Sequence, residues 1–557
     1  MVKIAVNNGV GLILVGLGLF FSLSAMLNFN GPLQEDTQSK LFLGVLLFKV
    51  GLIFTGLMII VFGKLLKSYS TRQVTSSKKH SRNEWIVFLG VLCAAAFLRF
   101  YGLNDGLWLD EILTQVNYTK ASFGEIFTTY DSQNQHFLYS MLSHSSYLLF
   151  GESAWALRLP AALFGLASIW ALYEFGKEVS SRREALLSCA LFAFSYHHIW
   201  FSQNARGYTG LLFFTLLGSW MLIRGLNENQ PWQWIGYGIA AALGSYTHIT
   251  MVFVVLSHFL IYLLHLCKYR GNTWDNKWMP LAGFFLGAVL TFQLYAFILP
   301  QMLGGTISDG SIVASWKNPL WALTEFVRGA KIGLKGIVPG IIGLGIFVAG
   351  LWGFARRKPV VIELLMVPTV IVAFITVAMG HHIWPRLFFF TFGFLVLILA
   401  HGCMQFGGII IRLLKFEREK STVFGTVLFL IILFASAISV PSAYGPKQDY
   451  LGALSFVENN RGSGDIVFSV GAARFVYEKF YKAAWKWAES AEEIEAALQS
   501  SKHVWLIYTL PFHLETVYPD IMRLIKHEFR VVEKYYGTLN GGTIYICINK
   551  GIDDGKE

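Results

Sequence analysis

The sequence predicts an α-helical membrane protein that crosses the bilayer many times and ends in a small α/β domain. Apolar residues make up 54% of the 557 residues and charged residues only 14%, whereas ordinary soluble domains carry about 25% charged residues. The apolar residues gather in about thirteen runs of bilayer-spanning length. The C-terminal tail instead alternates short helical and extended patterns, which is typical of an α/β domain.

The candidate spans follow one another from the N-terminus to residue 440. A transmembrane helix needs about 20 mostly apolar residues. Runs of this kind lie at 9–28, 41–63, 84–100, 156–176, 185–201, 208–226, 232–247, 249–267, 279–300, 336–354, 360–380, 386–408 and 421–440. No small-residue cleavage site precedes Asn28, and a second apolar run follows soon after it. We therefore expect the first run to be an uncleaved anchor.

The composition excludes several other classes of protein. A mean hydropathy of +0.51 with so few charges does not fit a soluble multidomain enzyme, a coiled coil or a disordered protein. The five cysteines are isolated, so they form neither a disulfide framework nor a CxxC zinc or redox motif. The net charge of +11 does not indicate nucleic-acid binding, because the basic residues are not gathered on one soluble face.

The basic residues instead predict the orientation of the chain in the membrane. Short cytoplasmic loops are rich in Lys and Arg, and the basic clusters follow the even-numbered spans. These clusters lie at 67–82, 177–183, 224, 268–277, 356–358 and 412–420. We therefore expect a cytoplasmic N-terminus and an extracytoplasmic C-terminus.

This topology divides the chain into three expected parts. Residues 1–83 form a two-helix module with a cytoplasmic linker, and residues 84–440 form a transmembrane core with outer loops at 101–155 and 301–335. Residues 441–557 form an extracytoplasmic α/β domain. Within it, helices are expected at 450–459, 491–499 and 520–528, and strands at 465–470, 503–508 and 543–549.

Two adjacent carboxylates open the first outer loop. Asp110 and Glu111 follow Trp108 and Leu109, a few residues beyond the third span. Carboxylates at a membrane–water boundary are costly unless they are paired or used. A purely structural alternative stays open, because acidic residues also favour the first turn of a helix, here one expected over 112–118.

Three arginines are expected at the same face of the membrane. Arg158 stands at the start of the fourth span, Arg206 lies in the polar turn after the fifth span, and Arg386 precedes a later span. The planar guanidinium group suits phosphate oxygens, although Arg158 could simply extend its charged end into water. Together with the carboxylates, these arginines predict a pocket for a membrane-anchored phosphate substrate.

Two pairs of adjacent histidines raise the question of a metal. Neighbouring side chains on a helix point about 100° apart, so His197 with His198, or His381 with His382, would seldom bind one ion. A zinc site would need further ligands from other helices. We expect no metal at the site and no required cofactor, with a divalent metal as the less favoured alternative.

Four motifs lie in order along the first outer loop and the segments that follow it. They are Leu107-Trp108-Leu109-Asp110-Glu111; Gln135-His136-Phe137-Leu138-Tyr139; Phe150-Gly151-Glu152 with Leu157-Arg158-Leu159-Pro160; and Ser202-Gln203-Asn204-Ala205-Arg206-Gly207-Tyr208. Together they resemble motifs of the C-type (GT-C) membrane glycosyltransferases, in the branch of dolichyl-phosphate-mannose protein mannosyltransferases and bacterial lipid A aminoarabinose transferases. The second is similar to that family's His-Pro-Pro-Leu-Tyr and the fourth to its Ser-Gln-Glu-Ala-Arg-x-Tyr. The resemblance is closest over residues 84–226. Both family prolines are replaced, by Phe137 and Leu138, and Asn204 replaces a commonly acidic residue.

The resemblance implies transfer of a monosaccharide, with inversion, from a polyprenyl-phosphate donor to an extracytoplasmic acceptor. Asp110 would be the base, which typically contributes about 10²–10⁴-fold, and Glu111 would either support the site from behind this base or orient the acceptor. Arginines would stabilise the departing phosphate. The residues expected to bind the donor phosphate or sugar are Arg206, Tyr208, Arg158, Arg386 and His136. The acceptor would be a protein, a glycolipid or a polysaccharide, and the setting a bacterial inner (plasma) membrane.

Two other functions compete with this one. A transporter or flippase of lipid-linked saccharides would show an internal repeat and interrupted helices near the bilayer midplane, but no repeat is visible and the polar residues crowd one face. A non-catalytic subunit that presents the tail to a partner would leave Asp110, Glu111 and Arg206 without a role. Acceptor choice is expected to depend on loop 301–335 and the tail.

Overall fold

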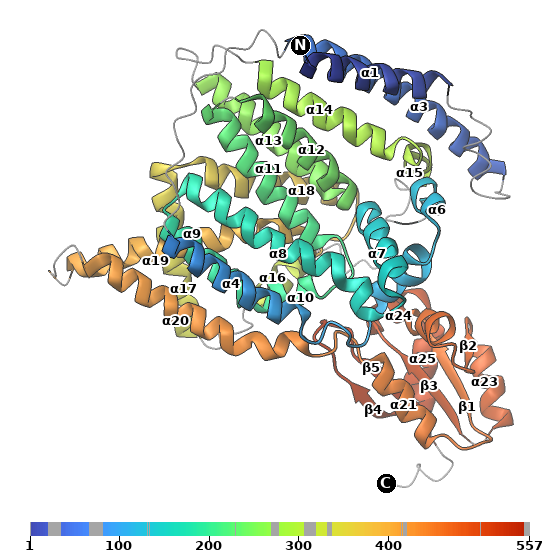
Figure 1. Cartoon of the computed structure of the whole chain (residues 1–557). Coiled ribbons are helices and arrows are strands. Elements are labelled where there is room, and N and C mark those ends of the chain that lie inside the picture. The colour runs from blue at the N-terminus through green and yellow to red at the C-terminus, as the bar shows by residue number, and fades with distance from the viewer. Residues whose placement is uncertain are drawn as a thin grey trace.

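A computed structural model describes residues 2–20, 35–65, 82–130, 132, 134–228, 230–268, 278–305, 319–330, 337–413, 415, 420–501 and 503–550. A bundle of long helices carries a small α/β unit at one end (Figure 1). The end of the first expected span, most of the expected linker at 68–83 and much of the expected loop 301–335 lie outside these residues.

Ten helical segments within the described ranges are long and apolar enough to cross a membrane, so the chain is a multi-pass membrane protein. The helices in these segments are α3 (Glu35–Leu65), α4 (Arg82–Phe100), α8 (Ala154–Val179), α11 (Tyr208–Glu228), α13 (Thr250–Lys268), α14 (Trp278–Tyr295), α17 (Ile337–Arg357), α18 (Val360–Ala378), α19 (Phe392–Leu413) and α20 (Lys420–Ser439). Short 3₁₀ segments precede α19 and follow α20; they are η5 (Pro385–Thr391) and η6 (Val440–Tyr444).

The expected count of thirteen spans is not confirmed, because three of the apolar runs form shorter helices. In α1 (Val2–Phe20) the apolar helix described is Gly9–Phe20, and α12 (Pro231–Thr247) has 17 residues. The run at 185–201 breaks into α9 (Arg182–Ala193) and α10 (Tyr196–Ser202). The hydroxyl of Ser195 accepts a hydrogen bond from the His198 amide at 3.5 Å and so caps α10.

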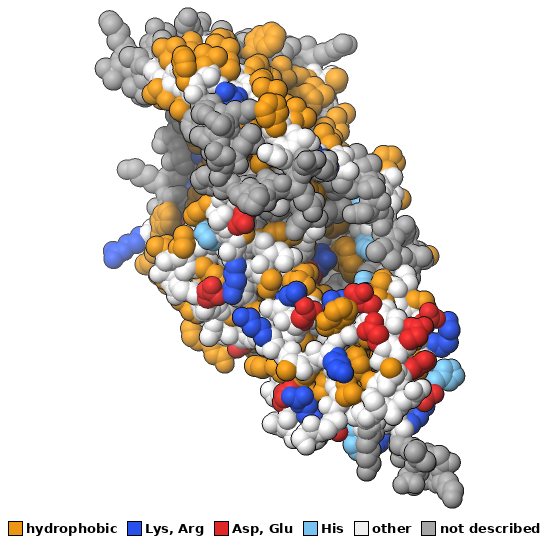
Figure 2. Space-filling model, turned by 90° about the vertical axis from the view of Figure 1, so that its right-hand side faces the viewer, with side chains coloured by type: hydrophobic (Ala, Val, Ile, Leu, Met, Phe, Trp, Pro, Cys, Tyr) orange, Lys and Arg blue, Asp and Glu red, His pale blue; other side chains and the backbone are white. Residues whose placement is uncertain are grey.

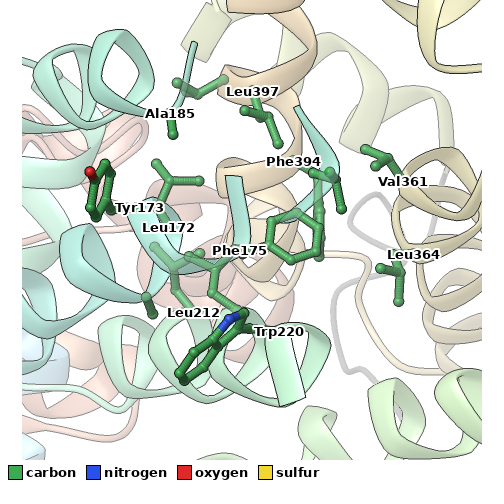
Figure 3. Close-up of a cluster of buried hydrophobic side chains, with 14 of the residues drawn as sticks. Leu172, Tyr173, Phe175, Ala185, Leu212, Trp220, Val361, Leu364, Phe394 and Leu397 are labelled. Atoms are coloured by element: carbon green, nitrogen blue, oxygen red, sulfur yellow. The ribbon is translucent and has the colours of Figure 1, made fainter. Parts of the chain in front are cut away.

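The largest hydrophobic core lies among α8, α9, α11, α18 and α19. Phe175 of α8, Leu212 of α11 and Phe394 of α19 are buried in it and lie close together (Figure 3). Gly176 lets α8 approach α9 closely, since a Cβ there would be 2.9 Å from the Cβ of Ala185. Such small residues matter in a bilayer, where helices associate through close packing because the lipid is itself apolar.

The two N-terminal helices form a pair at one edge of the bundle (Figure 1). They pack on each other, and α3 also packs on α14 and α15 (Leu299–Gly305), where Phe48 of α3 stacks on Phe297 with ring centroids 4.3 Å apart. This arrangement is compatible with an added module, and the division of the chain into three parts stays a proposal.

The first expected loop is itself largely helical. It contains α5 (Leu109–Thr114), the π-helix η3 (Gln115–Thr119), α6 (Phe123–Thr128) and α7 (Phe137–Phe150). The helix expected over 112–118 is therefore present but begins at Leu109, so that Asp110 and Glu111 lie in its first turn. In the second expected loop, α16 (Pro319–Ala330) brings Trp321 against Trp384, with ring centroids 5.4 Å apart.

The tail folds into a five-stranded sheet with helices, as its alternating pattern predicted. Its elements are α21 (Tyr450–Asn460), β1 (Ile466–Val470), α22 (Ala472–Phe475), the π-helix η7 (Val476–Phe480), β2 (Lys486–Ala488), α23 (Ala491–Ser500), β3 (Val504–Tyr508), α24 (Pro511–Val517), α25 (Pro519–Glu528), β4 (Phe529–Tyr535) and β5 (Ile544–Asn549). The strand order is β2-β1-β3-β5-β4. Strands β2, β1 and β3 are parallel, whereas β5 is antiparallel to β3 and β4. The sequence patterns missed the two edge strands.

The tail unit shares a hydrophobic core with the first loop. Ile112 of α5 and Tyr139 of α7 belong to the same buried cluster as Tyr450, Tyr477 and Ile507 of the tail. Figure 2 shows charged side chains of both signs interspersed over the lower part of the molecule, where the tail lies, and mainly hydrophobic side chains over α1 and α3 at the top. The tail is thus joined to the helical bundle through the segment that carries Asp110.

Candidate active site

Asp110 is held between two arginines that come from distant parts of the chain. Its Oδ2 lies 2.9 Å from Nη1 of Arg386, in η5, and 3.5 Å from Nη1 of Arg206, in the turn between α10 and α11. The Asp110 side chain is 14% exposed, so it is not fully buried between the two arginines. The structure therefore brings together three of the residues that the sequence singled out.

The two arginines differ in their surroundings. The Arg206 side chain is only 4% exposed, its Nη1 donates to Oδ1 of Asn134, and its Nε is buried without a hydrogen-bond partner. Its guanidinium carbon lies 5.8 Å from the centre of the Tyr208 ring. Arg386 is 27% exposed and lies 4.8 Å above the Trp384 ring. Two cations face one carboxylate, which leaves a net positive charge suited to an anion.

His136 adds a neutral imidazole beside Arg206. Burial, together with the nearby charges of Arg206 and Arg386, lowers the pKa of His136 well below its usual range, although a hydrogen bond to the Thr247 backbone opposes this. Because Nε2 is the nitrogen without a partner, the bond to the Thr247 carbonyl comes from Nδ1–H. Nε2 is thus left as a buried acceptor, and the ring lies 5.8 Å from that of Tyr208.

Asn134 is a site residue that sequence reasoning missed. Its side-chain oxygen accepts a hydrogen bond from Arg206, while its Nδ2 is buried and has no hydrogen-bond partner. Buried polar atoms without partners are rare and call for a ligand, water or another explanation. The only sequence signal was its place two residues before His136, and an asparagine in a loop is too common to stand out.

The structure buries Glu111 in an ion pair. Its side chain is fully buried, and it accepts hydrogen bonds from Nε and Nη2 of Arg158 at 2.7 and 2.6 Å and from the Ala205 amide at 2.8 Å. Burial alone would raise the pKa of Glu111, but Arg158 and Lys447, with these hydrogen bonds, hold it below its usual range. Glu111 therefore lies behind the site as a supporting group, and its part in the reaction stays a prediction.

Arg158 has no hydrogen-bond donor left for a phosphate. A guanidinium group carries five N–H donors, and here two bond to Glu111 while three bond to the carbonyl oxygens of Leu103, Asp105 and Gly106 at 2.8–3.1 Å. The side chain neither extends into water nor lines the site, since it is only 3% exposed. Its expected role as a phosphate ligand is replaced by a structural one.

The pair of Glu111 and Arg158 fixes the turn that carries Arg206. Glu111 bonds to the Ala205 amide, and the indole Nε1 of Trp108 donates to Oδ1 of Asn204 at 3.2 Å. Asn204, which departs from the family motif, thus acts as an acceptor for a side chain of the first loop. In the same turn only glycine fits at Gly207, because a Cβ there would lie 2.5 Å from the Thr247 carbonyl oxygen.

The paired histidines do not converge on a metal site. The His198 ring is buried between Nη2 of Arg99 at 2.6 Å and Oγ of Ser168 at 2.8 Å. Across the described residues no group of three or more His, Cys, Asp or Glu side chains could hold an ion. At the site itself the one accessible carboxylate faces two guanidinium groups, and this donor set does not suit a divalent cation. We derive no step through a metal, and independence from metal stays a prediction.

Part of the chain is similar to known mannosyltransferases. Residues 136–296 match the family model described as dolichyl-phosphate-mannose-protein mannosyltransferase. The matched segment contains His136, Arg158, Arg206 and Tyr208. YkcB of Bacillus subtilis (strain 168), a protein assigned as a mannosyltransferase, is 25% identical over 206 residues, which make up 34% of this chain. The match spans only 27% of the length of that relative.

Solved structures of membrane glycosyltransferases are also similar in part. ArnT from Cupriavidus metallidurans, in the apo state, gives a TM-score of 0.43 at 12% identity, covering 84% of this chain and 98% of that one. The Pmt1-Pmt2 protein O-mannosyltransferase complex of S. cerevisiae, bound to its sugar donor, gives 0.33 at 17% identity, covering 44% and 35%. The family match over residues 136–296 confirms the resemblance that the loop motifs predicted, and over this segment the chain is similar to the dolichyl-phosphate-mannose-protein mannosyltransferases.

Proposed function

We propose that the chain transfers one monosaccharide from a polyprenyl-phosphate donor to an extracytoplasmic acceptor, with inversion at the anomeric carbon. The observation that carries this proposal is the position of Asp110, a partly exposed carboxylate, between Arg206 and Arg386. A base beside two fixed cations suits a reaction in which a hydroxyl attacks and a phosphate leaves.

In this proposal the two arginines stabilise the leaving phosphate group. As the bond between the anomeric carbon and the phosphate oxygen breaks, its electron pair stays on the lipid phosphate. Arg206 and Arg386 stabilise this growing negative charge through groups that are already in place. One phosphodiester charge would also neutralise the excess positive charge of the site. Binding of the donor phosphate would compete with Asp110 for the arginines and so free the carboxylate.

In this proposal Asp110 is the base that takes the proton of the acceptor hydroxyl. The acceptor hydroxyl oxygen forms its bond to the anomeric carbon on the face opposite the departing phosphate, and the hydroxyl proton passes to Asp110.

Asn134 and His136 suit the donor sugar, because Nδ2 of Asn134 is an unused hydrogen-bond donor and Nε2 of His136 an unused acceptor. A sugar hydroxyl can both donate and accept a hydrogen bond, so the two groups are complementary to it.

The orientation follows from the basic loops. Arg182 pairs with Glu84 at 2.9 Å, at the end of α4 opposite to the end that leads to Asp110. Basic loops mark the cytoplasmic side, so we place the site and the tail outside the cytoplasm. A bacterial inner membrane is the proposed setting, with a protein, a glycolipid or a polysaccharide as acceptor.

The test uses the purified full-length chain with synthetic polyprenyl-phosphate sugars and measures the release of polyprenyl phosphate. We expect Asp110→Asn to lower turnover by about 10²-fold or more while it still binds the donor, and Arg206→Ala to weaken donor binding. Glu152→Gln, which alters an exposed carboxylate of the same outer loop, is the matched control and should turn over normally.

Two results would contradict parts of this proposal. Wild-type turnover by Asp110→Asn would exclude Asp110 as the base, and no turnover of any lipid-phosphate sugar by the wild-type chain would exclude the reaction class. Turnover that persists in EDTA would support independence from metal, and its loss would contradict that expectation.

A further inference from the structure

Lys447 is a buried lysine that connects the tail to the site. It lies in the short segment between η6 and α21 and is only 8% exposed. Its Nζ donates to the carbonyl oxygen of Gln203 at 2.7 Å and lies 5.0 Å from the centre of the Trp200 ring. Gln203 begins the turn that carries Arg206, so this ammonium group holds the turn from the side of the tail.

The tail in turn holds Lys447 in place. The backbone amide of Leu539 bonds to the Lys447 carbonyl at 3.3 Å, and the amide of Thr538 bonds to the Pro446 carbonyl at 2.8 Å. The hydroxyl of Thr538 also accepts a hydrogen bond from the Trp200 indole at 2.9 Å. The segment after β4 therefore fixes both the backbone of Lys447 and the ring beside its ammonium group.

The neighbouring glutamine extends this connection to α5. Oε1 of Gln448 accepts a hydrogen bond from the Leu109 amide at 3.1 Å, while its Nε2 donates to the Thr509 hydroxyl at 3.2 Å. Leu109 directly precedes Asp110. Two consecutive residues of the tail segment thus contact both parts of the site, the turn with Arg206 and the helix with Asp110.

The charge of Lys447 is balanced by the same residues that fix the turn. Burial lowers the pKa of Lys447 to about 8; Glu111 and Asp105 oppose this shift, and Arg158 adds to it. Glu111 bonds to the Ala205 amide and Lys447 to the Gln203 carbonyl. The turn is therefore held from both sides by two oppositely charged, buried groups.

We infer that Lys447 is a positioning residue through which the tail unit keeps Arg206 in place for the donor phosphate. The inference rests on the proposed function, since it assigns the tail a part in the same reaction. Lys447 does not itself bind the substrate, because its ammonium group is buried and bonded to the Gln203 carbonyl. The tail would then be a component of the site in addition to any role in acceptor choice.

The test compares Lys447→Met and Lys447→Arg with the wild-type chain and with Lys486→Met, an exposed lysine of β2. Loss of a hydrogen bond from a charged group typically weakens an interaction about tenfold or more. We therefore expect Lys447→Met to weaken binding of a polyprenyl monophosphate by about tenfold and to lower turnover, Lys447→Arg to restore both in part, and Lys486→Met to change neither.

The pH profile separates positioning from general loss of structure. Turnover by the wild-type chain should fall above pH 8 as Lys447 loses its proton. Lys447→Arg should keep its turnover at higher pH. Turnover by Lys447→Met, which has no proton to lose at this position, should show no such fall above pH 8. The titration of Lys447 does not itself destabilise the fold. Between pH 8 and the ordinary lysine pKa, the Lys447 side chain binds more protons in the unfolded chain than in the folded chain, so its contribution makes the free energy of unfolding rise with pH. Loss of turnover in that range is then not explained by unfolding through Lys447.

Hydrogen–deuterium exchange supplies a readout that needs no activity. We expect faster amide exchange over residues 203–207 in Lys447→Met and unchanged exchange in Lys486→Met. Unchanged exchange and unchanged lipid-phosphate binding in Lys447→Met would overturn the inference while leaving the proposed reaction intact. A wild-type chain that turns over no lipid-phosphate sugar would refute the reaction, and exchange over 203–207 would still test the role of Lys447.

Discussion

Replacing Glu111 by Gln should destabilise the fold rather than remove a catalytic group. The variant keeps the shape of the side chain but removes the carboxylate that pairs with Arg158. It also turns an NH₂ group toward the Arg158 donors, where an oxygen now accepts hydrogen bonds at 2.6–2.7 Å. The Arg158 charge would stay buried, since the side chain is 3% exposed.

The magnitude follows from this burial. Removing one partner of a buried ion pair typically costs about 3–5 kcal/mol, because the other charge is left uncompensated. We therefore expect Glu111→Gln to lower the free energy of unfolding by about this amount, measured as a lower unfolding temperature of the detergent-purified chain by tryptophan fluorescence. Glu152→Gln is the control, because Glu152 is 59% exposed in its pair with Lys120 and exposed pairs contribute about 0–1 kcal/mol.

A second substitution distinguishes a structural role from a catalytic one. Adding Arg158→Met to Glu111→Gln removes the unpaired charge and should recover much of the lost stability, because neutral replacement of a whole buried pair is often tolerated. Turnover by the double variant should return along with the folded fraction. A Glu111→Gln chain that has the wild-type unfolding temperature but no turnover would refute this reasoning. It would indicate that Glu111 takes part in the reaction itself.

Two further predictions concern the same turn. Gly207→Ala should lower turnover and cost about 1–3 kcal/mol of stability, because its Cβ would meet the Thr247 carbonyl at 2.5 Å; Gly106→Ala, where a Cβ meets open space, is the control, and equal effects of the two would contradict the packing argument. Because the pKa of Glu111 is lower in the folded chain than in the unfolded chain, its contribution to stability should be complete above its ordinary pKa and be lost as the pH falls through its folded pKa. Unfolding temperatures measured from pH 7 to pH 3 should therefore fall less steeply for Glu111→Gln than for the wild type, and parallel curves would contradict this.

Much of the fold could be predicted because hydropathy and periodicity are local signals. Every long apolar run became a helix or a pair of helices, and the six tail elements that alternation predicted are present. The break within the run at 185–201 was missed, because hydropathy does not register the capping of α10 by Ser195. Strand β4 was missed because it is an edge strand with charged residues such as Arg530 and Lys534, which hide the alternation.

The site was predicted by residue type, but the partners of each residue were not. Asp110 and Glu111 are adjacent and chemically alike, yet Asp110 is partly exposed between Arg206 and Arg386 while Glu111 is buried with Arg158. The ion pair of Glu111 with Arg158 of α8 separates their roles, and that contact joins residues far apart in the sequence. Lys447 gave no signal as a site residue, because its importance comes from the carbonyl it reaches and not from any motif around it.

A structure of the full chain with a bound polyprenyl monophosphate tests the central claim most directly. The account predicts that phosphate oxygens lie at hydrogen-bond distance, about 2.7–2.9 Å, from both Arg206 and Arg386, with Asp110 released from at least one of them. A phosphate bound elsewhere, with the contacts of Asp110 to both arginines unchanged, would contradict it.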